Sequence, residues 1–279
     1  MPIHSERYRP YLGTRQPHER AWLVITTAGV RTAFSNRRFL GLLLIAWVPF
    51  VVRAVQIYAA ANFPQATFLE ISARTFRELL QQQGLFVFFI TVWVGSGLIA
   101  NDLHSNALQI YLSKPLTRAE YVAGKLGVLT VCLLLVTWAP AMLLLLVQAA
   151  LAGNLGFLAA NTFLIPAITV VSFVVVLVSS FTILALSSFS KSARFVAVAY
   201  AGLVFFSDAL FNVVRATTRH TTMSWVSPSA SVNQIGDAVF RLTPRFETPV
   251  VGSLATIAVL IGLSLLVLER RVRAVEVVG

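Results

Sequence analysis

Charge is scarce in this sequence of 279 residues: Asp, Glu, Lys and Arg together make up 12% of it, against roughly 25% in an ordinary soluble domain. Cysteine is almost absent too, and the single Cys132 excludes an internal disulfide framework. The four histidines are far apart in the sequence and form no pair with metal-ligand spacing: His4, His18, His104 and His220. The sequence therefore predicts neither a disulfide scaffold nor a metal site.

Long apolar stretches take the place of the missing charges. Hydrophobic residues make up 57% of the chain, and the mean hydropathy is +0.78. Six stretches contain only two charged residues, Arg53 and Asp208, and each is close to the ~20 residues that a membrane-spanning helix needs. Their unbroken apolar character favours helices, because barrel strands alternate apolar and polar residues. Pro49, Pro140 and Pro166 are expected to kink three of the helices.

The predicted fold class is therefore an all-α integral membrane protein. Residues 39–268 form a six-helix transmembrane domain, with spans at about 39–60, 84–101, 126–150, 162–186, 195–214 and 250–268. No cleavable signal peptide precedes the first span, so we expect that span to be an uncleaved anchor.

The basic residues predict the orientation. Of the segments that connect or flank the spans, one alternating set contains fifteen basic residues. The other set, 61–83, 151–161 and 215–249, contains six. The richer set is 1–38, 102–125, 187–194 and 269–279, which places both termini in the cytoplasm, with 269–279 as a cytoplasmic tail, by the positive-inside rule. The net charge of +11 thus indicates topology in an inner or plasma membrane. Because the basic residues are scattered over short loops, we expect no nucleic-acid partner.

The cytoplasmic N-terminal segment, 1–38, contains a predicted amphipathic helix at Glu19–Arg38. One face carries Arg20, Thr27, Arg31 and Arg38, and the opposite face carries Trp22, Ile25 and Ala33. Such a helix suits the inner headgroup layer of the lipid bilayer. The alternative is a basic segment that only enforces topology.

The loop between the second and third spans is the most informative segment. Asp102 suits a helix N-terminus, and apolar residues follow at helical spacing. Lys114-Pro115 should end that helix, because the residue before a proline avoids the α conformation. Thr117 and Glu120 match a capping box that starts a new helix leading into the third span. The sequence predicts a short amphipathic helix, a stop and a second, capped helix.

This loop resembles the corresponding loop of ABC-2-type transporter permeases. The resemblance rests on Tyr-Leu-Ser-Lys-Pro-Leu-Thr-Arg at 111–118, on Glu120-Tyr121 and on Gly124-Lys125. Asp102 and Asn106 depart from it, since many relatives have Glu and Gly there. The resemblance implies that residues 102–118 include a coupling helix that docks on a separate ABC ATPase. The residues it implies at this coupling loop are Asp102, Asn106, Tyr111, Ser113, Lys114, Pro115, Arg118, Glu120 and Lys125.

ATP binding is expected on the partner and not on this chain. Gly124-Lys125 is no Walker A loop, because Ala119 and Leu126 stand where that motif requires Gly and Ser or Thr. We therefore expect no catalytic residue and no cofactor here, with ATP and Mg²⁺ on the ATPase subunit. The resemblance also implies a dimer with a second copy or with a homologous permease.

Two groups of residues within the spans are candidates for a translocation path. Gly95-Ser96-Gly97 allows close backbone approach, so it suits tight helix packing or, alternatively, a pore lining or hinge. Asp208 and Asn212 share a helix face with Arg215 and form either a structural polar cluster or part of the path.

The remaining loops, 61–83 and 215–249, are expected to form short helices that rest on the outer interface. They are too small for a separate domain. The predicted function is an exporting permease. The alternatives are a secondary transporter or channel, which would need no ATPase, and a membrane scaffold that transports nothing.

Overall fold

The computed structural model describes residues 21–62, 71–107, 117–152 and 156–272, and within these ranges the chain is helical and has no strands. The helices of the first half are α1 (Ala21–Ser35), α2 (Arg37–Ala46), α3 (Val48–Asn62), α4 (Ala73–Ile90), the π-helical turn η3 (Thr91–Gly95), α5 (Ser96–His104), α7 (Arg118–Leu134) and α8 (Trp138–Leu151). Those of the second half are α9 (Gly156–Ala160), α10 (Leu164–Ser187), α11 (Ala193–Thr218), the 3₁₀ turn η4 (Ser224–Val226), α12 (Pro228–Val239) and α13 (Val250–Arg271).

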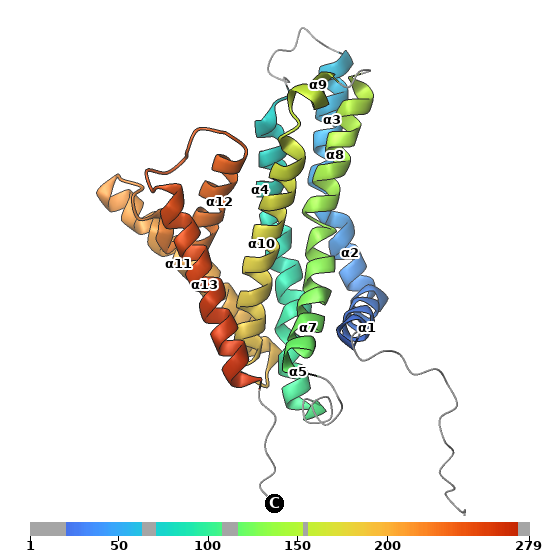
Figure 1. Cartoon of the computed structure of the whole chain (residues 1–279), viewed down its shortest axis with the longest axis vertical. Coiled ribbons are helices and arrows are strands. Elements are labelled where there is room, and N and C mark those ends of the chain that lie inside the picture. Colours follow the sequence, from blue (N-terminus) through green and yellow to red (C-terminus); the bar gives the residue numbers. More distant parts are fainter. Residues whose placement is uncertain (1–20, 63–70, 108–116, 153–155, 273–279) are drawn as a thin grey trace, which may run out of the picture.

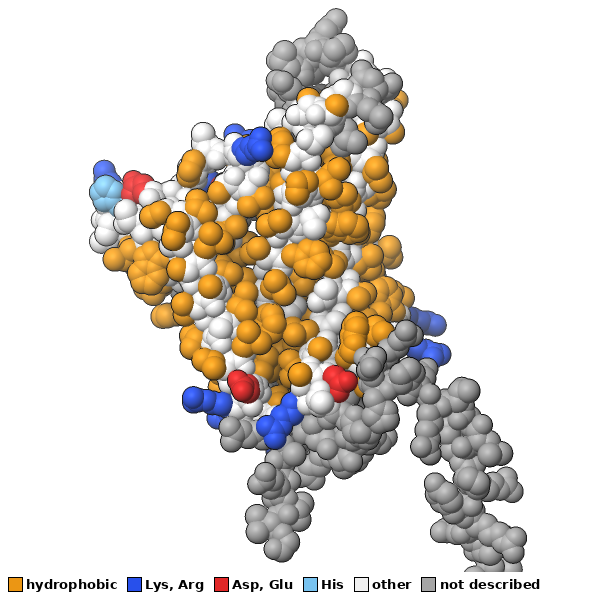
Figure 2. Space-filling view, in the orientation of Figure 1, with side chains coloured by type: hydrophobic (Ala, Val, Ile, Leu, Met, Phe, Trp, Pro, Cys, Tyr) orange, Lys and Arg blue, Asp and Glu red, His pale blue; other side chains and the backbone are white. Residues whose placement is uncertain are grey.

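Six of these helical segments are long and apolar enough to cross a membrane, as predicted. They are Arg37–Asn62, Ala73–His104, Arg118–Leu151, Leu164–Ser187, Ala193–Thr218 and Val250–Arg271. Most extend beyond the apolar stretches of the sequence, because the helices continue into charged residues at their ends. Figure 2 shows the same division in space: apolar side chains cover the flank of the molecule, and charged side chains gather toward its two ends.

Two of the three expected proline effects are present. The first span is interrupted at Trp47 and the third between Leu134 and Trp138, and in each case a proline lies in the first turn of the helix that follows. A proline is tolerated there because the first turn needs no backbone donor. The prediction of a kink at Pro166 is wrong, because α10 runs from Leu164 to Ser187 without an interruption and Pro166 lies in its first turn.

Figure 1 shows which segments share an end of the helical bundle. The helix α1, the end of α5, the start of α7 and the end of α13 lie at one end, which we call the α1 end. The other end carries α9 and the starts of α4 and α10, with α12 on the same side; we call it the α12 end. In this view α11 and α13 lean away from α8 toward the α12 end.

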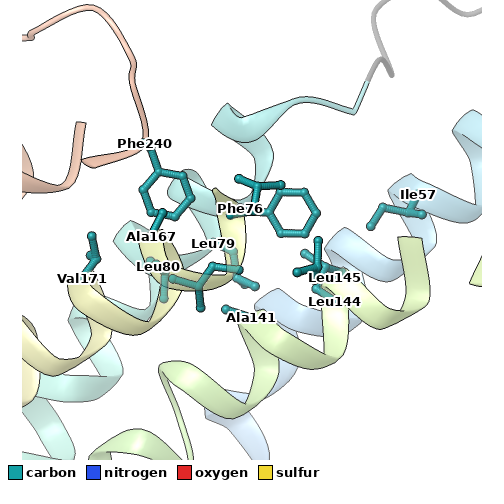
Figure 3. Close-up of a cluster of buried hydrophobic side chains, with 12 residues drawn as sticks. Ile57, Phe76, Leu79, Leu80, Ala141, Leu144, Leu145, Ala167, Val171 and Phe240 are labelled. Atoms are coloured by element: carbon teal, nitrogen blue, oxygen red, sulfur yellow. The ribbon is translucent and has the colours of Figure 1, made fainter. Parts of the chain in front are cut away.

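A buried apolar cluster joins four spans near the α12 end (Figure 3). Phe76 and Leu79 of α4 pack with Leu144 of α8 and Ile57 of α3, and Phe240 closes the cluster just after α12. A second cluster, near the α1 end, includes Ile99, Tyr121, Leu184, Val196 and Leu268. Side chains from distant parts of the sequence therefore fix the bundle at both ends.

The expected interfacial helices in the two remaining loops are corrected by the structure. Residues 73–83 are the first part of α4 and continue directly into the second span. The helix α12 is not a surface helix either, because it packs against α10, α11 and α13. Its buried residues include Gln234, Ile235 and Asp237, so this part of the loop enters the bundle.

A buried ion cluster anchors α12 to α4. Arg77 Nε lies 3.0 Å from Asp237 Oδ1, and Arg245 Nε lies 2.7 Å from Asp237 Oδ2. The side chains of Arg77 and Asp237 are only 2% and 1% exposed. Arg77 also donates to the carbonyl and side-chain oxygens of Asn233 at 3.0 and 2.9 Å. Nothing in the spacing of Arg77 and Asp237 along the chain predicts that their side chains meet.

We expect Asp237→Asn to destabilise the protein strongly, because it leaves two guanidinium groups without their carboxylate. Breaking a buried ion pair costs about 3–5 kcal/mol. The measurement is the melting temperature of the detergent-solubilised chain, with Glu247→Gln as the control at a half-exposed carboxylate. Equal melting temperatures for Asp237→Asn and the parent would contradict the anchoring role of the cluster.

Candidate functional site

An ion pair at the α1 end joins the two helices that flank the 102–118 segment. Lys125 Nζ of α7 lies 2.7 Å from Asp102 Oδ2 of α5. The hydroxyl of Tyr121, one helical turn before Lys125, donates to the same oxygen at 2.7 Å. The Lys125 and Asp102 side chains are 11% and 16% exposed, and Tyr121 is fully buried. Since a buried charge is stable only when it is paired, this cluster holds α5 and α7 in a fixed register.

The start of α7 is capped as predicted. Thr117 Oγ1 accepts from the backbone N–H of Glu120 at 3.2 Å, and Glu120 Oε2 accepts from the backbone N–H of Thr117 at 2.8 Å. The Thr117 hydroxyl also donates to Glu120 Oε2 at 2.8 Å. This reciprocal arrangement is a capping box, and it fixes the point at which the chain enters α7.

The helix α1 packs directly on α7, and two glycines of α7 make the close approach possible. The Thr26 hydroxyl donates to the Gly124 carbonyl at 3.0 Å. A Cβ added at Gly124 would lie 2.7 Å from Ile25 Cβ, and one added at Gly127 would lie 2.4 Å from Thr26 Oγ1. Only residues without a side chain fit at these two positions. The sequence analysis missed this contact, although the pair of small residues three apart in α7 was a usable signal.

The other side of α5 is held against α10 by one buried hydroxyl. Ser187 Oγ accepts from the backbone N–H groups of Ile99 and Ala100 at 3.2 and 2.9 Å, and it donates to the Ser96 carbonyl at 2.9 Å. A Cβ at Gly95 would lie 2.7 Å from Ile183 of α10. Gly95, the last residue of the π-helical turn η3, and Ser96 therefore lie at a tight contact with α10. A Cβ at Gly97 would meet only Asn101 of the same helix.

The expected helix start at Asp102 is wrong. This residue lies in the last turn of α5, which continues from the second span and ends at His104. Asn106 follows with a φ of 54°, a left-handed conformation that asparagine adopts more readily than most residues. Glu120 and the exposed Arg118 lie in the first turn of α7. Four of the predicted coupling residues lie outside the described part of the chain: Tyr111, Ser113, Lys114 and Pro115.

The polar residues of α11 do not form one compact cluster. The half-buried Asp208 accepts a hydrogen bond from Ser227 Oγ, the N-cap of α12, so this carboxylate links two helices. Asn212 and Arg215 are exposed. Arg53 pairs with Glu78 of α4 at 3.0 Å. In the described ranges, no three His, Cys, Asp or Glu side chains lie close enough together to hold a metal ion.

The six long apolar helices define a helical, multi-pass membrane protein. The family model described as "ABC-2 family transporter protein" matches residues 23–272. The chain therefore belongs to the ABC-2 family, and it is a membrane permease of an ABC transporter. No curated protein sequence matches it.

We expect Gly124→Val to displace α1 from α7, because its Cβ would lie too close to Ile25 and to the Trp22 carbonyl. Hydrogen exchange of Ala21–Ser35, measured by mass spectrometry on the full chain, should become at least several-fold faster. The neighbouring exposed position provides the control, and Ala123→Val should leave exchange unchanged. If both variants behave like the parent, the tight α1–α7 contact is not required to protect α1.

Proposed function

We propose that this permease is the membrane subunit of an exporter driven by a separate ATP-hydrolysing subunit, and that the 102–118 segment is its contact with that subunit. One observation carries the proposal: the mostly buried Asp102–Lys125 ion pair, with Tyr121 on the same oxygen, joins the helices on either side of the segment. A force applied to the segment would therefore move α5 and α7 as one unit. ATP and Mg²⁺ would bind on the partner subunit.

The contacts around the ion pair suggest how such a movement would spread. The helix α5 is hydrogen-bonded to α10 through Ser187, and α7 carries α1 through Thr26. Packed helices transmit displacement because close-packed interiors are difficult to compress. A push on the 102–118 segment would therefore reach four helices: α1, α5, α7 and α10.

The charge distribution supports the orientation of the proposed exporter. By the positive-inside rule, the distribution of basic residues favours a cytoplasmic location for the α1 end, in an inner or plasma membrane. The same assignment suits α1 as an interfacial helix, since Trp22, Leu23 and Val24 are exposed. A second permease copy or a homologous permease would complete the transporter.

Isolation of the native complex tests the proposal. The tagged chain, purified from its own membranes, should carry an ABC ATPase at fixed stoichiometry, and the complex should hydrolyse ATP in vesicles. Transport by the chain alone, with no ATPase bound, would instead identify a secondary transporter. A chain that binds an ATPase but moves nothing in either direction would be a scaffold.

We expect the double variant Lys114→Glu and Arg118→Glu to release or uncouple the ATPase while the permease remains inserted, because it reverses two charges in the 102–118 segment. The measurements are co-purification and ATP hydrolysis. The matched control reverses two exposed charges elsewhere at the same end, Arg37→Glu and Arg270→Glu. Unchanged assembly and hydrolysis in the first variant would show that the segment is not the contact.

We expect Lys125→Met to impair coupling without removing the ATPase, because the Lys125 and Asp102 side chains are only 11% and 16% exposed and offer little surface to a partner. Removing one partner of a buried pair costs about 3–5 kcal/mol, so a lower melting temperature should accompany the loss. The double variant Asp102→Lys with Lys125→Asp, which exchanges the two charges, should recover part of the coupling and part of the melting temperature. Normal ATP-driven transport by Lys125→Met would contradict the role of the ion pair.

A further inference from the structure

A polar groove lies beside the N-terminal part of α4, at the α12 end of the bundle and far from the 102–118 segment (Figure 1). It has a volume of 520 Å³ and is lined by Arg74, Glu78, Gln81, Gln82, Leu85 and Arg245. Five of these six side chains are charged or carry an amide, although four of the five belong to a helix that continues into an apolar span. A polar lining at the end of a membrane helix is the chemistry of the headgroup layer and not of the hydrocarbon.

The groove is short of negative charge. Only two carboxylates pair with the four arginines in and next to the groove. Glu78 pairs with Arg53 and Arg74, and Asp237 pairs with Arg77 and Arg245. The cluster therefore carries two uncompensated positive charges. Topology does not account for them, because the positive-inside rule favours basic residues at the opposite, α1 end. An anionic ligand would balance this excess.

Two of the arginines are positioned to receive such a ligand. The Arg245 guanidinium is oriented by Asp237, and by Gln81 Oε1 at 2.7 Å from its Nη1. Arg74 uses its Nε for Glu78 at 3.1 Å, and its side chain is 72% exposed. Guanidinium groups bind phosphate in a two-pronged geometry, and the Gln82 amide can donate to the same group.

An apolar strip continues from the groove along the same helix. Leu85, which lines the groove, is followed four residues later in α4 by Phe89, and Trp93 lies further along the same span in the π-helical turn η3. All three are exposed to about half of their full extent, at 57%, 47% and 47%. Residues four apart share a face of an α-helix, so Leu85 and Phe89 form an apolar strip that begins in the polar groove, with the exposed Trp93 beyond it. This is the shape of an amphiphile with a charged headgroup.

We propose that the polar groove binds the phosphate of an anionic amphiphile, with the phosphate at Arg74 and Arg245 and the acyl chains along Leu85, Phe89 and Trp93. The inference goes beyond the proposed export function, and it requires neither the ATPase nor transport. The apolar strip distinguishes a lipid phosphate from free phosphate.

Native mass spectrometry on the full chain in detergent tests this proposal. The probes are dioctanoyl phosphatidylglycerol, uncharged dioctanoylglycerol and glycerol 3-phosphate at equal concentrations. Only the first combines a phosphate with acyl chains, so only the first should bind. The variant Arg74→Gln with Gln82→Ala should weaken its binding about tenfold or more, since it removes one charge-assisted contact and one neutral donor.

Arg215→Gln is the matched control, since it removes an exposed arginine of α11 that does not line the groove. It should bind dioctanoyl phosphatidylglycerol like the parent, and melting temperatures verify that all variants are folded. Equal binding of glycerol 3-phosphate would overturn the assignment to an amphiphile. Equal binding of dioctanoylglycerol, or an equal loss in Arg215→Gln, would overturn the phosphate site itself.

Discussion

A hydrocarbon solvent offers no partner to a polar group, and this constraint shapes the whole chain. Each backbone N–H and C=O within the bilayer must find its partner inside the protein, which is why the described residues form helices that run from end to end of the bundle. Where the first and third spans are interrupted, at Trp47 and just before Trp138, a new helix begins within a few residues. The same constraint requires every buried charge to be paired.

The two main ion pairs lie at opposite ends of the bundle and join different helices. At the α1 end, Asp102 and Lys125 join α5 to α7, whereas Arg77 and Asp237 join α4 to α12 at the other end. The first pair lies beside a loop and leaves it anchored on both flanks. The second holds a helix inside the bundle that its sequence alone would place at the membrane surface. One ion pair thus fixes α5 to α7, and the other fixes α12 to α4.

The sequence predicted those features that depend on local composition. Six apolar stretches of the right length gave the six helices, and the spacing of Thr117 and Glu120 gave the capping box. Features that depend on distant contacts were missed. The meeting of Arg77 with Asp237 has no local signature, because the partners are far apart in the chain. For the packing of α1 on α7, Gly124 and Gly127 indicate a close contact but not which helix makes it. The helix start at Asp102 was wrong because a favourable N-terminal residue also occurs in the last turn of a helix that arrives from the membrane.

The central claim is that the 102–118 segment is a lever moved by a separate nucleotide-driven subunit. A cryo-electron microscopy structure of the permease in its native complex tests it most directly. The account predicts that the segment sits in a surface recess of the ATPase, with the Asp102–Lys125 pair intact behind it. A structure in which the segment projects into solvent, with no nucleotide-binding subunit in contact with it, would contradict the account.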